Sequence, residues 1–139
     1  MGTLPLQVSV ELPLSGALTT DYVPDRALRL QLYRRMAGLR NLEEVEMMRS
    51  ELDDRFGSPP PEVDNLLYQL RIKVLAAEAG IVSIASEGGQ ILIQFTPGQT
   101  PTGDLGPEVR MSKRGLWLTS ATWQDSLMGL LLNLTLQPA

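Results

Sequence analysis

The fold is decided around residues 41–61, which have the sequence NLEEVEMMRSELDDRFGSPPP. Asn41 is a preferred helix N-cap residue, and Glu44 follows three positions later, as in a capping box. Apolar residues then recur at spacings of three and four, at Leu42, Val45, Met48, Leu52 and Phe56. Gly57 and the prolines after it prevent the helix from continuing. This segment therefore predicts an amphipathic helix with one buried stripe.

A helix is predicted on each side of this segment. Pro24 and Asp25 favour a helix start, and residues 25–39 carry two apolar faces, which predicts a helix packed on both sides. One face comprises Leu28, Leu32, Met36 and Leu39, and the other comprises Leu30, Tyr33 and Ala37. The prolines at 59–61 open a further helix, which we expect to end at Gly80.

The rest of the chain predicts strands and a final helix. Strands are predicted at residues 8–12, 81–86, 91–95, 109–111 and 116–118, and the helix at residues 122–136. Gly88 and Gly89 between two of these strands indicate a β-hairpin. The predicted fold class is α+β: an N-terminal strand and three-helix layer, followed by a small antiparallel sheet and a C-terminal helix.

The length of 139 residues suits one domain, so we expect residues 1–139 to form a single domain. Residues 1–7 are expected to be an extended or disordered leader. Residues 97–107 are rich in proline and glycine, and we expect them to form a flexible loop.

Composition excludes several classes of function. The chain has no cysteine and no histidine, so thiolate metal sites, His-ligated zinc and Ser-His-Asp triads are impossible within it. We expect no metal and no cofactor. The formal net charge is −4, whereas domains that grip nucleic acid carry a basic excess, so we expect no direct nucleic acid binding. No signal peptide or membrane span is indicated, and a cytoplasmic location is expected.

The candidate binding residues lie on the helix of residues 41–57. Glu44, Met47, Glu51 and Asp54 fall along one flank of it, beside the buried stripe. Glu51 can pair locally with Arg55, four residues later, leaving Asp54 solvated. The same acidic ridge can instead receive arginines of a partner, because guanidinium–carboxylate contacts are strong and directional. The residues alone leave both interpretations open.

Two basic doublets and two tryptophans are further candidates for contact with a partner or a nucleic acid. Arg34-Arg35 is expected on a solvent-exposed helix face, and Lys113-Arg114 at the solvent-exposed tip of a hairpin. Trp117 and Trp123 are expected in a core or an interface, although either could stack on a base.

Three motifs in fixed order carry a resemblance to a known family. They are DYVPD at residues 21–25, RLQLYRR at residues 29–35 and ELDDRFG at residues 51–57. In this order and spacing they resemble the C-terminal domain of bacterial transcription-repair coupling factors (Mfd proteins), over roughly residues 8–95. The resemblance implies a parent that is a large ATP-dependent DNA translocase, which displaces stalled RNA polymerase and recruits the repair protein UvrA.

The resemblance also implies a role and a set of site residues. The domain would pack on an N-terminal UvrB-like module of the same protein and mask the surface that binds UvrA. Glu51 and Asp54 would face arginines of that module, and Arg55 would hold Glu51. Phe56 and Gly57 would serve as core anchor and cap, and Tyr33 would pack. Relatives usually have a further helix where residues 98–107 form a loop here, so a shortened C-terminal third is expected.

This interpretation makes the chain a non-catalytic regulatory module of a larger protein. One alternative is a stand-alone acidic adaptor that binds some basic protein. Another is a small hydrolase that uses paired carboxylates, which would need a cleft gathering two acids with raised pKa values. The acidic neighbours Glu43-Glu44 and Asp53-Asp54 point about 100° apart on a helix, which disfavours such a dyad.

Overall fold

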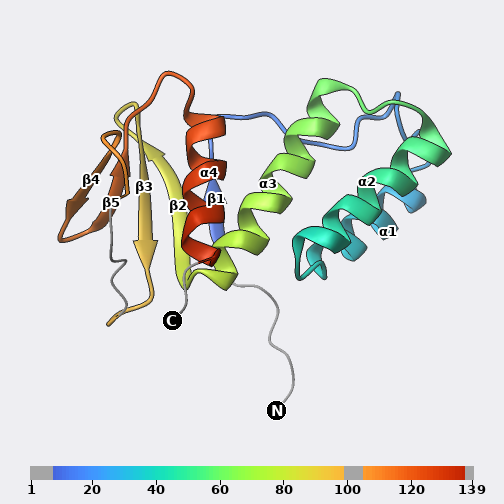
Figure 1. Cartoon of the computed structure of the whole chain (residues 1–139). Coiled ribbons are helices and arrows are strands. Elements are labelled where there is room, and N and C mark those ends of the chain that lie inside the picture. The colour runs from blue at the N-terminus through green and yellow to red at the C-terminus, as the bar shows by residue number, and fades with distance from the viewer. Residues whose placement is uncertain (1–7, 99–104, 137–139) are drawn as a thin grey trace, which may run out of the picture. The chain divides into compact units, whose positions relative to one another are not determined.

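The computed structural model describes residues 8–98 and 105–136, with side chains up to residue 134. The chain divides into two compact units, each coloured by residue number in Figure 1. Of the described residues, one unit comprises 14–74 and is called the helical unit. The other comprises residues 8–13, 75–98 and 105–136 and is called the sheet unit.

Three helices begin in the helical unit, and the boundary between the units falls within the third. They are α1 (Arg26–Ala37), α2 (Leu42–Phe56) and α3 (Pro61–Glu78). The Asp25 carboxylate caps α1 by accepting from the Ala27 N–H at 2.9 Å. Asn41 caps α2 by accepting from the Glu44 N–H at 2.8 Å. The predicted helix starts and the proline-led start of α3 are therefore confirmed.

The core of the helical unit combines the stripes of these helices with the segment before α1. Its buried members are Leu18, Tyr22, Val23, Leu32, Met36, Val45, Met48, Leu52, Val63, Leu67 and Val74. Phe56 and Leu42 pack against this cluster from its edge. The buried stripe predicted for α2 is thus present, with both of its ends partly open to solvent.

The second apolar face predicted for α1 is not packed. Leu30 is 47% exposed, Tyr33 is 38% exposed and Ala37 is also exposed. The Tyr33 hydroxyl accepts a hydrogen bond from the Leu18 N–H at 2.7 Å, so the ring lies along the surface. The prediction failed because a second run of apolar residues at helical spacing does not specify whether anything covers it.

The sheet unit is a mixed five-stranded sheet with a helix. Its elements are β1 (Ser9–Glu11), β2 (Ile81–Glu87), β3 (Gln90–Phe95), β4 (Val109–Ser112), β5 (Gly115–Leu118) and α4 (Trp123–Leu136). The strand order is β1-β2-β3-β5-β4, with β1 and β4 at the two edges (Figure 1). Both predicted hairpins are antiparallel, whereas β1 pairs with β2 in parallel. The α+β class is confirmed, and the N-terminal strand joins the sheet.

One face of this sheet carries the core of the unit. Ile84, Ile93 and Leu116 share that face and are buried, as are Leu127 and Leu131 of α4. Glycine is required at the β2–β3 turn and at the first residue of β5. Gly88 and Gly89 have φ angles of 60° and 79°, as a tight hairpin turn requires. Gly115 has φ 144°, and a Cβ there would collide with the Ile93 carbonyl oxygen.

The structure does not describe all of the predicted leader and the predicted loop. The leader at residues 1–7 and part of the loop, residues 99–104, lie outside the described residues. The described ends of that loop, residues 97–98 and 105–107, contain no helix or strand.

Candidate functional site

The candidate site lies on the solvent-facing side of α2. This side of the helix forms a shallow hollow, which we call the α2 outer face. Its lining residues are Glu43, Glu46, Met47, Ser50, Glu51, Asp54 and Arg55. It therefore includes three of the four residues predicted to bind a partner.

Glu51 is the most constrained residue of the α2 outer face. Its carboxylate accepts two hydrogen bonds from the Arg35 guanidinium of α1, at 2.6 and 2.8 Å. Arg55 adds a third contact at 3.2 Å, from one helical turn further on. The pKa of Glu51 is lowered to about 2, mainly by the hydrogen bonds from Arg35 and to a smaller extent by the one from Arg55. Glu51 is thus a fixed anion, held by two arginines at once.

The link to Arg35 is one that sequence reasoning missed. The local pair of Glu51 with Arg55 follows from their i, i+4 spacing. Arg35 is 16 residues away from Glu51, and only the packing of α1 against α2 brings the two together. The available signal was the Arg34-Arg35 doublet in the last turn of α1. Of these two arginines, only Arg35 contacts Glu51 in the structure.

The other exposed groups of the α2 outer face are a methionine and acids. Met47 is 66% exposed, the largest value among the exposed large apolar residues of the described chain. Asp54 is exposed as well. Glu46 is paired with Arg71 of α3 at 2.7 Å. A thioether between carboxylates offers a partner an apolar contact surrounded by negative charge.

Glu44 differs from the other three predicted contact residues. Its carboxylate turns back to the start of α2 and accepts from the Arg40 N–H at 2.7 Å. It is half-buried and does not line the hollow. In a capping box the Glu side chain accepts from the N–H of the N-cap residue, here Asn41. The bond to the Arg40 N–H is therefore displaced by one residue. Glu44 serves the helix start in this structure.

Three of the residues predicted as structural, Arg55, Phe56 and Gly57, lie at the end of α2, where Tyr22 also contacts the chain. The Tyr22 hydroxyl donates to the carbonyls of Leu52 and Gly57, at 3.0 and 2.7 Å. Burial is the main cause that raises the Tyr22 pKa. Its ring centroid lies 5.6 Å from that of Phe56, and the Arg55 guanidinium lies 5.3 Å from the Phe56 centroid. Gly57 has φ 89° and ψ −175°, a conformation essentially restricted to glycine.

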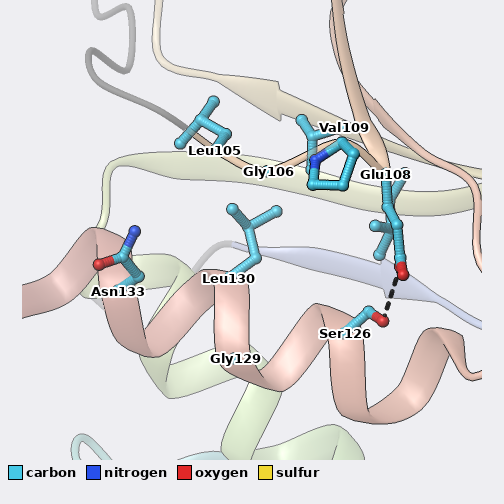
Figure 2. A pocket seen from close by; sticks show the side chains of 10 residues that line it. Leu105, Gly106, Glu108, Val109, Ser126, Gly129, Leu130 and Asn133 are labelled. Carbon is cyan, nitrogen blue, oxygen red and sulfur yellow. Dashed lines mark hydrogen bonds between the residues drawn. The ribbon is translucent and has the colours of Figure 1, made fainter.

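A second hollow lies in the sheet unit, between the segment before β4 and α4 (Figure 2). Its lining includes Leu105, Glu108, Ser126, Gly129 and Leu130. The Ser126 hydroxyl donates to the Glu108 carboxylate at 2.9 Å, which ties α4 to the start of β4. This polar pair is satisfied internally, and the rest of the lining mixes apolar and polar side chains.

Among the residues that the structure describes, no group of three or more acidic residues is placed to hold a metal ion. No helix in the described part of the chain is long and apolar enough to cross a membrane.

The chain is similar to known proteins in both sequence and fold. It is 40% identical over 91 residues to a transcription-repair-coupling factor of Rickettsia conorii, and 38% identical over 94 residues to that of Rickettsia bellii. These matches cover 66% and 68% of the chain but 8% of each relative. A Staphylococcus epidermidis transcription-repair-coupling factor is 32% identical over 93 residues, 67% of the chain and 8% of the relative.

The fold matches a solved structure, the crystal structure of the C-terminal domain of a transcription-repair coupling factor. The TM-score is 0.74 at 18% identity, over 94% of this chain and 95% of that chain. The expectation of a shortened C-terminal third is therefore wrong for this neighbour, because the likeness extends over nearly all of both chains. The TRCF domain model matches residues 12–104. The chain belongs to the TRCF domain family.

Proposed function

We propose that this chain is a non-catalytic regulatory module of a transcription-repair coupling factor. In this proposal it packs on the UvrB-like N-terminal module of the same protein and masks the surface that binds UvrA. The mask opens when the ATP-dependent translocase of the parent engages stalled RNA polymerase. UvrA and RNA polymerase are thus indirect partners.

The observation that carries the proposal is the composition of the α2 outer face. It combines the exposed thioether of Met47 with the carboxylates of Glu43 and Asp54. Such a surface complements arginines flanking an apolar side chain on a partner. Membership of the TRCF domain family supports the intramolecular partner, because the chain spans about 8% of the length of its curated relatives.

Glu51 has a specific part in this proposal. Since Arg35 and Arg55 already engage it, a partner arginine adds to an ordered cluster and need not organise a mobile side chain. The cluster keeps Glu51 in one rotamer and so lowers the entropy lost on association. Asp54, which is exposed at the edge of the hollow, is the acid that a partner arginine can engage directly.

The contact must be reversible to act as a mask. Rim ion pairs contribute about 1 kcal/mol or less each, and burial of one methionine adds about 1.5–3 kcal/mol. A closed state that dominates by a few kcal/mol is released when the motor binds a ligand that prefers the open state.

The test is calorimetric titration of this chain with the isolated UvrB-like module of the parent protein. The double variant Met47→Ala with Asp54→Lys is expected to weaken binding by about tenfold or more. Glu51→Lys is avoided, because it would place a third cation beside Arg35 and Arg55 and perturb the fold itself.

The matched control is Asp53→Lys, which makes the same charge change on the same helix. Asp53 is exposed and does not line the α2 outer face, so its variant is expected to bind like the parent chain. Equal affinity of all three proteins for the module would overturn the proposal. Equal weakening toward the module and toward an unrelated basic protein would favour the alternative, an adaptor with general affinity for cations.

A further inference from the structure

The basic residues of the sheet unit are confined to one hairpin. From residue 75 to the end of the chain, the sequence contains three basic residues, Arg110, Lys113 and Arg114. All three lie in β4 or in the turn that joins it to β5. Within the sheet unit, positive charge is thus concentrated on one short ribbon, well away in sequence from the α2 outer face.

The cations of this ribbon differ in how far they are paired. Arg114 makes a bidentate pair with Glu87 at 2.9 and 3.1 Å. Arg110 and Lys113 have no acidic partner within 4.0 Å among the described residues, and both are exposed. The hairpin therefore carries charge that the described part of the chain does not neutralise.

The strand that bears these cations is also an edge of the sheet. β4 is last in the strand order, and in the described part of the chain no strand pairs with its outer side (Figure 1). The Thr119 N–H donates to the Glu108 carbonyl at 3.0 Å, and hydrogen-bonded pairs alternate along an antiparallel ladder. The backbone N–H and C=O of Met111 therefore point outward from the edge.

The two faces of β4 offer different side chains. Arg110 lies opposite Trp117, with its guanidinium 5.7 Å from the ring centroid. Arg114 lies 5.5 Å from the same centroid, and the Trp117 indole N–H donates to Ser112 at 2.9 Å. On the other face, Met111 is 55% exposed and lies opposite the buried Leu116. One face is thus cationic and the other apolar.

We propose that β4 binds an extended segment of a partner protein, which adds a sixth strand to the sheet. The segment alternates acidic and apolar residues: its carboxylates meet Arg110 and the face around Trp117, and its apolar side chains cover Met111. Main-chain bonds at Met111 supply affinity, and the alternation supplies specificity. Charge complementarity selects an acidic segment.

A peptide fits these observations better than a nucleic acid does. Single-stranded nucleic acid uses phosphate contacts and stacked bases and has no need of a strand edge. The outward N–H and C=O of Met111, beside a half-exposed methionine side chain, match a peptide backbone and an apolar residue. Positive charge on an edge strand also discourages pairing between copies of this chain while leaving an acidic strand free to add.

The test is titration of the whole chain with a short capped peptide that alternates glutamate and valine, followed through backbone amide NMR shifts. The largest shifts are expected in residues 109–112, centred on the Met111 amide. The double variant Arg110→Glu with Lys113→Glu is expected to weaken binding by about tenfold or more. Arg26→Glu with Arg34→Glu, both exposed on α1, reverses the same amount of charge and is expected to have little effect.

Backbone pairing is tested separately from charge. Met111→Pro removes the outward N–H at a site where an edge strand tolerates proline, and it is expected to abolish binding, whereas Met111→Leu retains it. If Met111→Pro does not fold, methylating the valine nitrogens of the peptide tests the same bonds. Absence of shifts at β4 would overturn the proposal. Shifts caused by oligothymidylate, with the peptide silent, would also overturn it in favour of a nucleic acid surface.

Discussion

The helical and sheet units contain the same ion-pair chemistry in two settings. In the helical unit, Arg35 of α1 and Arg55 of α2 both engage Glu51, whose side chain is 32% exposed. In the sheet unit, Glu87 pairs with Arg114 alone, and both side chains are at least half exposed. Both carboxyl pKa values are lowered by an arginine hydrogen bond, but water screens the second pair much more. Only the first pair is placed to stabilise a fold.

The largest expected effect tests whether the two units are separate in stability. Leu52 is fully buried in the core of the helical unit, so Leu52→Ala is expected to cost about 2–5 kcal/mol in the free energy of unfolding. Native-state hydrogen exchange is expected to show lost protection mainly in α1 and α2. Leu131→Ala, at a fully buried site of α4, is the matched change in the sheet unit. Equal loss of protection in both units for either variant would show that they unfold as one.

The next effect concerns the end of α2. Tyr22→Phe removes a buried hydroxyl that donates to the Leu52 and Gly57 carbonyls, so we expect a loss of about 1–2 kcal/mol in denaturant unfolding. Tyr33→Phe is the control, because its hydroxyl belongs to a ring that is 38% exposed, and a smaller loss is expected. A loss for Tyr33→Phe as large as that for Tyr22→Phe would contradict the structural role given to Tyr22.

A pH titration compares the two ion pairs directly. The Glu51 pKa is about 2 in the folded chain and about 4.3 when unfolded, so its stabilisation is present above the unfolded value and is lost as the pH falls toward 2. After screening at this partly exposed site, we expect the loss to be about 1 kcal/mol.

The variants that isolate this effect are Glu51→Gln and Glu87→Gln. Denaturant unfolding measured between pH 5 and pH 2 is expected to show a weaker pH dependence for Glu51→Gln. The curve of Glu87→Gln is expected to follow that of the parent chain, because the pair of Glu87 is exposed. Identical curves for both variants would remove the distinction between the two pairs.

The local parts of the fold could be predicted from the sequence because their causes are local. Asn41 and Asp25 cap helices through bonds that span two or three residues. Gly88 and Gly89 supply the positive φ angles of a hairpin turn. The parallel pairing of β1 with β2 joins segments about 70 residues apart, and no local pattern specifies such a partner.

The candidate site shows the same division. Helical spacing placed Met47, Glu51 and Asp54 on one side of α2, and all three line the α2 outer face. The same spacing could not show that Glu44 turns back to the Arg40 N–H, because that choice depends on the path of the chain before the helix. It also could not find Arg35, whose position beside Glu51 depends on how α1 packs on α2.

The smallest expected effect is a gain, and it lies in the sheet unit. Gly129 is in the interior of α4, and a Cβ there would meet nothing within 4 Å. Gly129→Ala is therefore expected to raise the free energy of unfolding by about 0.5–1 kcal/mol, by restricting the unfolded chain. Gly115→Ala should do the opposite, because its Cβ would collide with the Ile93 carbonyl and disturb the pairing of β3 with β5. Thermal unfolding that falls for both variants would contradict the argument for Gly129, and a rise for both would contradict the collision expected at Gly115.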